Sequence, residues 1–178
     1  MRVSIIIPVK EINDYIRTAM PHYARLEEKD FEILIFPDEP TEEAFPEMNG
    51  KVRIIPSGKT GPAEKRDMAL QYAQGEIIAF IDDDAYPAPQ WLSRALPYFQ
   101  DPSVGAVGGP AVTAPEDDDW QKASGKVYES KLCSAGYTYR YLPEAKREVD
   151  DLPSVNLIVR AELFRKVGGY DSNYYPGE

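Results

Sequence analysis

Three consecutive aspartates, Asp82, Asp83 and Asp84, follow an apolar run near the middle of the chain. The run, residues 77–81, has the length and β-branched content of a fully buried strand. Because an unpaired carboxylate is costly to bury, the aspartates must emerge at the carboxyl end of that strand, where open α/β sheets bind ligands. If strand geometry persists, Asp82 and Asp84 point the same way and offer oxygen ligands suited to Mg²⁺ or Mn²⁺. Such an ion takes further ligands from substrate phosphates.

A solvated turn is the competing interpretation of this triplet, since aspartate and proline favour turns and charge runs are usually solvated. The context favours the metal site. A buried strand precedes the aspartates, and a helix is expected to begin between Pro87 and Trp91.

The composition narrows the class of protein. The 178 residues fit one domain, and the hydrophobic content of 43% is ordinary for a soluble globular protein. A net charge of −10 argues against a nucleic-acid binder. One cysteine, Cys133, excludes an internal disulfide and a cysteine-based zinc cluster. The single histidine, His22, argues against a Ser-His-Asp or histidine–metal mechanism.

Membrane and export signals are absent from the sequence pattern. No apolar stretch approaches the roughly 20 residues that span a bilayer. The first apolar run, residues 3–9, is too short for a signal peptide. We therefore expect a cytoplasmic protein, associated with the inner face of a membrane only through sequence beyond residue 178.

The order of elements predicts an α/β fold. Strands are expected at residues 3–9, 31–36, 51–56 and 77–81, with helices at about 12–26 and 62–74. This alternation is typical of a parallel, Rossmann-like sheet with right-handed crossovers, here over residues 1–99. Residues 100–178 read as an α+β half, with strands at 104–112 and 154–160, an acidic loop at 114–119, and helices at 120–133 and 161–167.

Glycine-rich phosphate loops do not occur at any strand-to-helix junction. Neither GxGxxG nor GxxxxGK[ST] is present, which disfavours a dinucleotide oxidoreductase and a P-loop enzyme. A metal ion held by the aspartates is then the natural way to bind phosphates.

Five segments in order resemble the family 2 glycosyltransferases, which have the GT-A fold. The segments are residues 4–16 (SIIIPVKEINDYI), 36–40 (FPDEP), 61–92, 104–112 (VGAVGGPAV) and 154–178. The third matches the family's Gly…Ala-Arg-Asn…Asp-x-Asp run almost continuously. The resemblance covers the whole chain and implies one GT-A domain over residues 1–178, with a nucleotide-binding half at 1–99 and an acceptor-side half at 100–178.

The resemblance implies a metal-dependent, inverting transfer of a sugar from a nucleotide-diphosphate donor to an acceptor hydroxyl on a glycan, lipid or protein. Asp84 would be the principal ligand of Mn²⁺ or Mg²⁺, and Asp82 would contact the nucleotide ribose or the metal shell. The implied donor-binding residues are Pro8, Val9, Glu11, Asp38, Arg66, Asp82, Asp83 and Asn156.

Particular roles follow from the same resemblance. Pro8 and Val9 would offer backbone to the nucleoside, Asp38 would contact base or ribose, and Arg66 would lie near the donor. The sugar pocket would be lined by Asn156 and Arg160, and at Gly108 and Gly109 the backbone would approach donor or acceptor.

Structural interpretations compete with several of these roles. Arg66 could be a surface residue paired with an acidic neighbour. Asn156 could satisfy neighbouring backbone groups. Trp91 and Trp120 fit packing anchors better than sugar platforms.

Three departures from the family pattern matter. Pro37 replaces the first acid of the nucleoside turn, and Asp67 replaces the asparagine after Arg66. The third is that the family's Glu-Asp motif would begin at Glu178, so its aspartate, the expected general base, would be the next residue. We therefore expect a truncated chain, which is inactive without that base.

Two other functions remain open. A sugar-1-phosphate nucleotidyltransferase shares the α/β architecture. Such an enzyme is expected to have a glycine-rich, basic loop after the first strand, where this chain has Lys10 and Glu11. A non-catalytic nucleotide-binding module would bind nucleotide without turnover.

Overall fold

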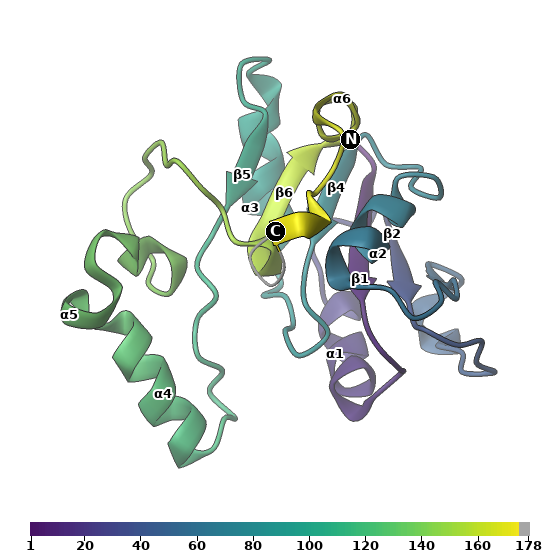
Figure 1. Cartoon of the computed structure of the whole chain (residues 1–178), viewed down its shortest axis with the longest axis horizontal. Helices are drawn as coiled ribbons and strands as arrows, with labels where there is room; N and C mark the ends of the chain where they lie inside the picture. Colours follow the sequence, from purple (N-terminus) through teal and green to yellow (C-terminus); the bar gives the residue numbers. More distant parts are fainter. Residues whose placement is uncertain (175–178) are drawn as a thin grey trace.

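The computed structural model describes residues 1–174 and shows a six-stranded sheet covered by helices on both faces (Figure 1). The strand order is β3-β2-β1-β4-β6-β5. The strands are β1 (Val3–Pro8), β2 (Phe31–Phe36), β3 (Val52–Ile54), β4 (Ile77–Phe80), β5 (Ala106–Gly108) and β6 (Leu157–Arg160). The four strands of the first half are parallel, and β6 is antiparallel to both β4 and β5. The predicted α/β class with a mostly parallel sheet is confirmed.

Helices connect and cover these strands. The α-helices are α1 (Asp14–Ala24), α2 (Pro62–Ala69), α3 (Trp91–Ala95), α4 (Asp119–Glu129), α5 (Lys131–Ser134) and α6 (Ala161–Val167). The 3₁₀ turns are η1 (Pro46–Met48), η2 (Leu96–Gln100), η3 (Ala135–Arg140), η4 (Ser154–Asn156) and η5 (Ser172–Tyr174). No helix within residues 1–174 has both the length and the apolar character needed to cross a bilayer.

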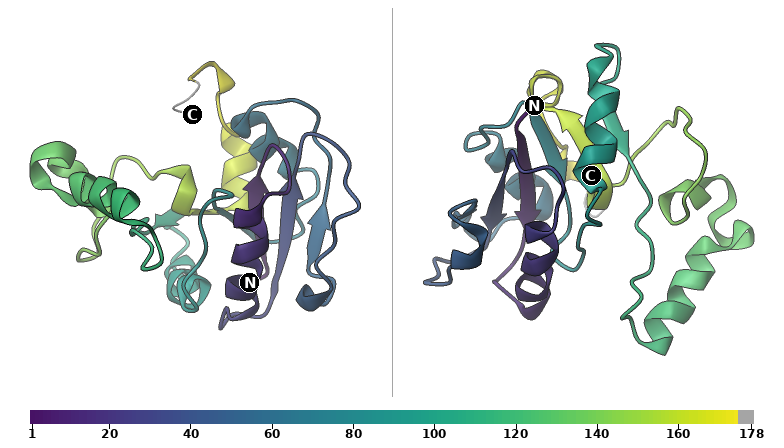
Figure 2. Two further views of the ribbon diagram at one scale, coloured as in Figure 1. Left: turned by 90° about the horizontal axis from the view of Figure 1, so that it is seen from below. Right: turned by 180° about the vertical axis from the view of Figure 1, so that it is seen from behind.

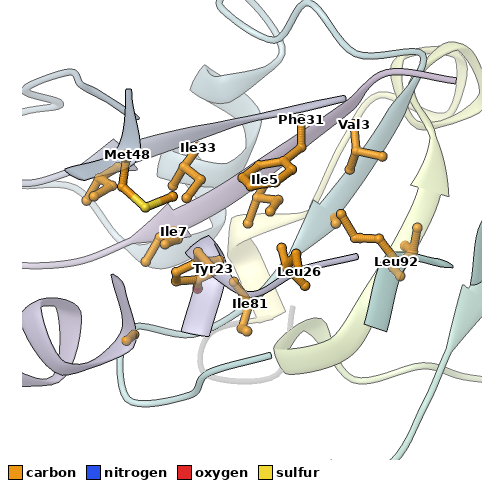
Figure 3. Close-up of a cluster of buried hydrophobic side chains, with 14 of the residues drawn as sticks. Val3, Ile5, Ile7, Tyr23, Leu26, Phe31, Ile33, Met48, Ile81 and Leu92 are labelled. Atoms are coloured by element: carbon orange, nitrogen blue, oxygen red, sulfur yellow. The ribbon is translucent and has the colours of Figure 1, made fainter. Parts of the chain in front are cut away.

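The central strands are apolar on both faces, because both faces are buried. Alternate residues of β1, β2 and β4, such as Ile5 and Ile33, pack with Tyr23 of α1 and Leu92 of α3 in one cluster (Figure 3). The residues between them pack against α2 and α6 in a second cluster, which includes Ile6, Leu34, Ile78, Ala69 and Phe164. The period of two along each strand therefore divides the core into two layers.

A buried polar network ties the amino-terminal ends of β1 and β2. The Ser4 hydroxyl donates to Glu32 Oε1 (2.7 Å) and accepts from the backbone N–H of Gly75 (2.8 Å). Glu32 Oε1 also accepts from the N–H of Gln74 (2.8 Å). α2 ends at Ala69 instead of continuing to residue 74 as predicted. The N–H groups of residues 74 and 75 bond to the side chains of Glu32 and Ser4 and are therefore not available to a helix.

The second half departs most from the sequence prediction. The expected helix 120–133 is two helices, because Ser130 has an extended backbone (ψ 128°) and caps α5 through its side chain. The segment from α4 to η3, green in Figure 1, stands apart from the sheet in the views of Figures 1 and 2. Trp120 is 86% exposed, so it does not anchor packing within residues 1–174, and the expectation that it would is wrong.

Several strands are also shorter than predicted. The expected strands 51–56 and 104–112 shrink to three residues each, and residues 154–156 form η4 instead of the start of β6. The proline and glycines around β5 limit regular pairing there.

We expect Ser4→Ala to lower the free energy of unfolding by about 1–3 kcal/mol, because it removes the acceptor of a buried N–H and a donor to a buried carboxylate. Urea denaturation measures the change. Ser124→Ala, on the exposed surface of α4, is the matched control and should stay within about 0.5 kcal/mol of wild type. Equal effects of the two substitutions would contradict this account of the network.

Candidate functional site

The candidate site lies at the carboxyl ends of β1, β2 and β4. The chain adds β2 and β3 on one side of β1 and then places β4 on the other, so the strand order reverses between β1 and β4. Open α/β sheets bind ligands outside the strand ends at such a switch point. Val9, Asp38 and Asp82 follow these three strands directly or closely, and their backbones therefore meet at one edge.

The aspartate triplet does not continue the strand. β4 ends at Phe80, and the backbone N–H of Ala85 donates to the carbonyl of Asp82 (3.2 Å), which closes a tight turn. The extended geometry on which the parallel orientation of Asp82 and Asp84 depended is therefore absent. The turn instead sends the carboxylates to different partners.

Each carboxylate of the triplet has its own surroundings. Asp82 Oδ1 accepts from Arg66 Nη2 (2.8 Å), and Asp83 Oδ2 accepts from Asn13 Nδ2 (2.6 Å). Partial desolvation, followed by the charges of Asp82 and Asp83, raises the pKa of Asp84, which is nevertheless an exposed residue. A divalent cation would relieve that repulsion.

The residues present fit a divalent ion that completes its coordination with substrate. Within residues 1–174, no three Asp, Glu, His or Cys side chains already form a metal cluster. Mg²⁺-type sites commonly use one or two carboxylates, with waters and substrate phosphates as the other ligands. The Asp84 carboxylate is exposed and would supply one such ligand, whereas Oδ1 of Asp82 already accepts from Arg66.

Arg66 is buried, so its interpretation as a surface residue is wrong. It is 4% exposed, lies on α2 and pairs with Asp82, and its guanidinium carbon lies 5.5 Å from the ring centre of Tyr170. Arg66 thus connects the aspartate turn to α2 and to the segment after α6.

Asp67, the departure that places an acid after Arg66, faces a neighbouring loop. Its Oδ1 accepts from the backbone N–H of Tyr170 (2.9 Å). Burial is the main cause that raises the pKa of Asp67, and this hydrogen bond acts in the opposite direction. Gly169 has φ +83°, and a Cβ there would lie 2.3 Å from the Asp67 carboxylate, so the turn requires glycine.

Lys65 and Asn13 are functional candidates that the sequence analysis missed. Lys65, 3% exposed, donates to the carbonyls of Val9 (2.5 Å) and Phe36 (3.3 Å) and pairs with Asp38 Oδ1. Asn13 caps α1 by accepting from the N–H of Ile16 (3.0 Å). Asn13 had a sequence signal as a helix N-cap. Lys65 had no such sequence signal, because a lysine on a predicted helix is usually interpreted as a solvent-exposed side chain.

The loops after β1, β2 and β3 are joined by backbone hydrogen bonds. The N–H of Asp38 donates to the carbonyl of Lys10 (3.0 Å), and the N–H of Gly58 donates to the carbonyl of Asp38 (3.0 Å). The Pro37 carbonyl accepts from both the N–H and the hydroxyl of Ser57 (2.8 and 2.9 Å). Pro37, which replaces an acid of the family pattern, is thereby fixed in this loop.

The remaining predicted donor residues lie around this edge. Pro8 and Val9 are buried at the end of β1, and Glu11 is exposed in the loop before α1. Asn156 accepts from Trp91 Nε1 (2.8 Å) and donates to the carbonyl of Pro110 (3.4 Å). The described contacts of Asn156 thus satisfy neighbouring groups of the chain, which agrees with its structural interpretation.

Arg160 lies at the wrong edge for a sugar pocket. The antiparallel register pairs Arg160 with Ile77, at the start of β4, and it pairs Leu157 with Phe80 at the site edge. The Arg160 side chain donates to the carbonyls of Phe99 (2.7 Å), Val104 (2.9 Å) and Asp101 (3.0 Å). The expectation that it lines the donor pocket is therefore wrong.

Two further expectations concern glycines and the chain end. A Cβ on Gly108 would lie 2.5 Å from Leu152, and one on Gly109 would lie 3.1 Å from Asn156. The close neighbours of both glycines are therefore other residues of the chain.

Glu178, the predicted start of the Glu-Asp motif, lies outside the described residues.

Comparison with known proteins assigns the family. The profile of Glycosyl transferase family 2 matches residues 4–168. The chain belongs to this family. A pre-mycofactocin glycosyltransferase of Mycobacterium tuberculosis is 30% identical over 118 residues, covering 66% of this chain and 24% of the relative. A glucosyl-dolichyl phosphate glucuronosyltransferase of Haloferax volcanii is 30% identical over 115 residues, covering 64% and 35%.

Solved structures confirm the GT-A fold. A mannosyltransferase of Pyrobaculum calidifontis, in complex with GDP-Man and Mn²⁺, superposes with a TM-score of 0.63 at 20% identity, covering 96% of this chain and 47% of its own. A fragment of TarS from S. aureus, in complex with UDP-GlcNAc, also superposes with a TM-score of 0.63. It is 19% identical, and the match covers 94% of this chain and 47% of the fragment. The chain thus spans less than half the length of these relatives.

We expect Asn13→Asp to lower the free energy of unfolding by about 1–2 kcal/mol, because it keeps a good N-cap but sets a second carboxylate against Asp83. The exchange Asn13→Asp with Asp83→Asn restores one donor and one acceptor, and it should recover most of the loss. Urea denaturation of the singles and the exchange tests the contact, and an Asn13→Asp variant as stable as wild type would contradict it.

Proposed function

We propose that this chain forms the donor-binding core of a metal-dependent, inverting glycosyltransferase. The reaction moves a sugar from a nucleotide-diphosphate donor to an acceptor hydroxyl. The observation that supports the proposal is the position of Asp38, just after β2, and of Asp82 and Asp84, just after β4, at the carboxyl edge of the sheet around the β1/β4 switch point of a family 2 chain. The donor sites of such sheets lie at this edge.

The predicted cofactor is Mn²⁺ or Mg²⁺, with Asp84 as the principal ligand and Asp82 at the nucleotide ribose or in the metal shell. When bound, the ion would neutralise the charge that develops on the diphosphate leaving group. The raised pKa of Asp84 and the Mn²⁺ in the related mannosyltransferase structure support this choice.

The chain's own residues would orient the donor. Arg66 holds Asp82 in place and keeps a positive charge next to the triplet. Asp38 offers a carboxylate to base or ribose, and the backbone at Pro8 and Val9 would face the nucleoside. Glu11, Asp83 and Asn156 remain predicted members of the donor site.

The acceptor side rests on the family pattern. We assign the start of the Glu-Asp motif to Glu178, and the general base would be an aspartate after it in a longer chain. That carboxylate would remove the proton of the acceptor hydroxyl as the hydroxyl attacks the sugar from the side opposite the leaving group. Glycan, lipid and protein acceptors all fit, and peripheral association with a membrane would accompany a lipid acceptor.

We expect one of UDP, GDP, dTDP and CDP to raise the melting temperature of the protein only when Mn²⁺ is present. A nucleotide at one hundred times its dissociation constant adds about 2.7 kcal/mol to the free energy of unfolding, which a thermal-shift assay detects. Asp84→Ala should abolish the shift because it removes the principal ligand.

The matched control is Asp150→Ala, which removes an exposed aspartate outside the site and should keep the full shift. A shift that survives in Asp84→Ala, or that needs no metal, would count against the assignment. Nucleotide binding without sugar transfer by a longer chain that carries the expected base would favour a non-catalytic module instead.

A further inference from the structure

The nucleoside end of the site contains a buried lysine that the proposed mechanism does not use. We propose that Lys65 is a positioning residue for nucleoside recognition, which fixes Asp38 and the ends of β1 and β2 without touching the donor itself. This inference rests on the proposed function, because that function assigns nucleoside recognition to Asp38.

The ammonium group of Lys65 is fully used within the protein. A lysine has three N–H donors and no acceptor. Lys65 meets three acceptors: the carbonyl of Val9 (2.5 Å), the carbonyl of Phe36 (3.3 Å) and Asp38 Oδ1. With the residue only 3% exposed, no donor remains for a phosphate. Lys65 therefore differs from a phosphate-binding lysine, which presents its charge to the ligand.

The position of Lys65 meets a local need of the sheet. β1 and β2 end with the pair Pro8 and Phe36, and Pro8 has no backbone N–H to give to the ladder. Buried carbonyls need donors, and at this end the N–H of Val9 reaches the Phe36 carbonyl (3.2 Å). The Lys65 ammonium donates to both the Val9 and the Phe36 carbonyl, and it thereby holds the ends of β1 and β2 together.

Asp38 is held at several points as a result. Its side chain is 13% exposed, Lys65 engages Oδ1, and its backbone bonds to Lys10 and Gly58. Among the contacts of residues 1–174, this arrangement leaves Oδ2 as the oxygen that can meet a nucleoside N–H or hydroxyl. Without Lys65, the Asp38 carboxylate would be a largely buried charge without its cation, and it would turn toward water.

Helix α2 places two consecutive cations on the two sides of the switch point. Lys65 reaches the ends of β1 and β2, whereas Arg66 reaches Asp82 after β4. Neighbouring residues of a helix project about 100° apart, so one turn of α2 can direct Lys65 toward β1 and β2 and Arg66 toward the aspartate turn. The effects of Lys65 should therefore be confined to the nucleoside part of the ligand.

Calorimetric titration separates the two parts of the ligand. The probes are the nucleoside diphosphate that wild type binds with Mn²⁺, and Mn²⁺-pyrophosphate, which lacks the nucleoside. We expect Lys65→Met to weaken binding of the nucleoside diphosphate about tenfold or more. The affinity for pyrophosphate should stay within about twofold of the wild-type value. Asp38→Asn should show the same selective loss, and the double variant should lose no more than the larger single loss, because Lys65 acts through Asp38.

Glu32→Gln is the control for general destabilisation. It perturbs a buried group at the other end of β2, and the ratio of the two affinities should stay unchanged. If Lys65→Met does not fold, Lys65→Gln, which keeps an N–H donor without the charge, answers the same question.

The outcomes distinguish the inference from the function on which it rests. Equal weakening of both probes by the Lys65 variant, or losses that add in the double variant, would overturn the role of Lys65 while wild-type binding stands. A wild-type protein that binds no nucleoside diphosphate would overturn the proposed function and this inference with it.

Discussion

The cost of gathering three carboxylates at the end of a buried strand shapes the whole candidate site. The fold meets this cost with specific partners: Arg66 from α2 pairs with Asp82, and Asn13 at the start of α1 donates to Asp83. Asp84 keeps a raised pKa next to the other two. The three carboxylates are thus held in place but still repel one another, and a nearby divalent cation would relieve such repulsion.

The two ends of the central strands are secured in different ways. At the amino-terminal end, Ser4 and Glu32 form a closed network with backbone N–H groups of the turn before β4. At the carboxyl end, Lys65 bonds to two strand-end carbonyls and to Asp38. Both networks satisfy buried polar groups, but only the second includes a carboxylate at the edge that carries the candidate site. Polar networks therefore hold the central strands at both ends, and the carboxyl end carries the candidate site.

Sequence patterns predicted the features that depend on apolar periodicity. The first four strands, the α/β class and the place of the aspartates all follow from buried runs and their ends. What stayed hidden depends on contacts between distant residues. A helical lysine such as Lys65 reads as solvated until the fold brings Asp38 to it. The antiparallel register of β6, which moves Arg160 away from the site, has no signal in the strand itself.

Paramagnetic broadening by Mn²⁺ in amide NMR spectra tests most directly whether a cation and a nucleoside diphosphate bind together at the switch point. With the bound nucleotide present, the account predicts that the amide signals of residues 82–85 and of Val9 and Lys10 broaden first. Signals around Ser4 and Glu32, at the other end of the same strands, should persist at equal Mn²⁺ concentration. Broadening centred elsewhere, or broadening that the nucleotide does not strengthen, would contradict the account.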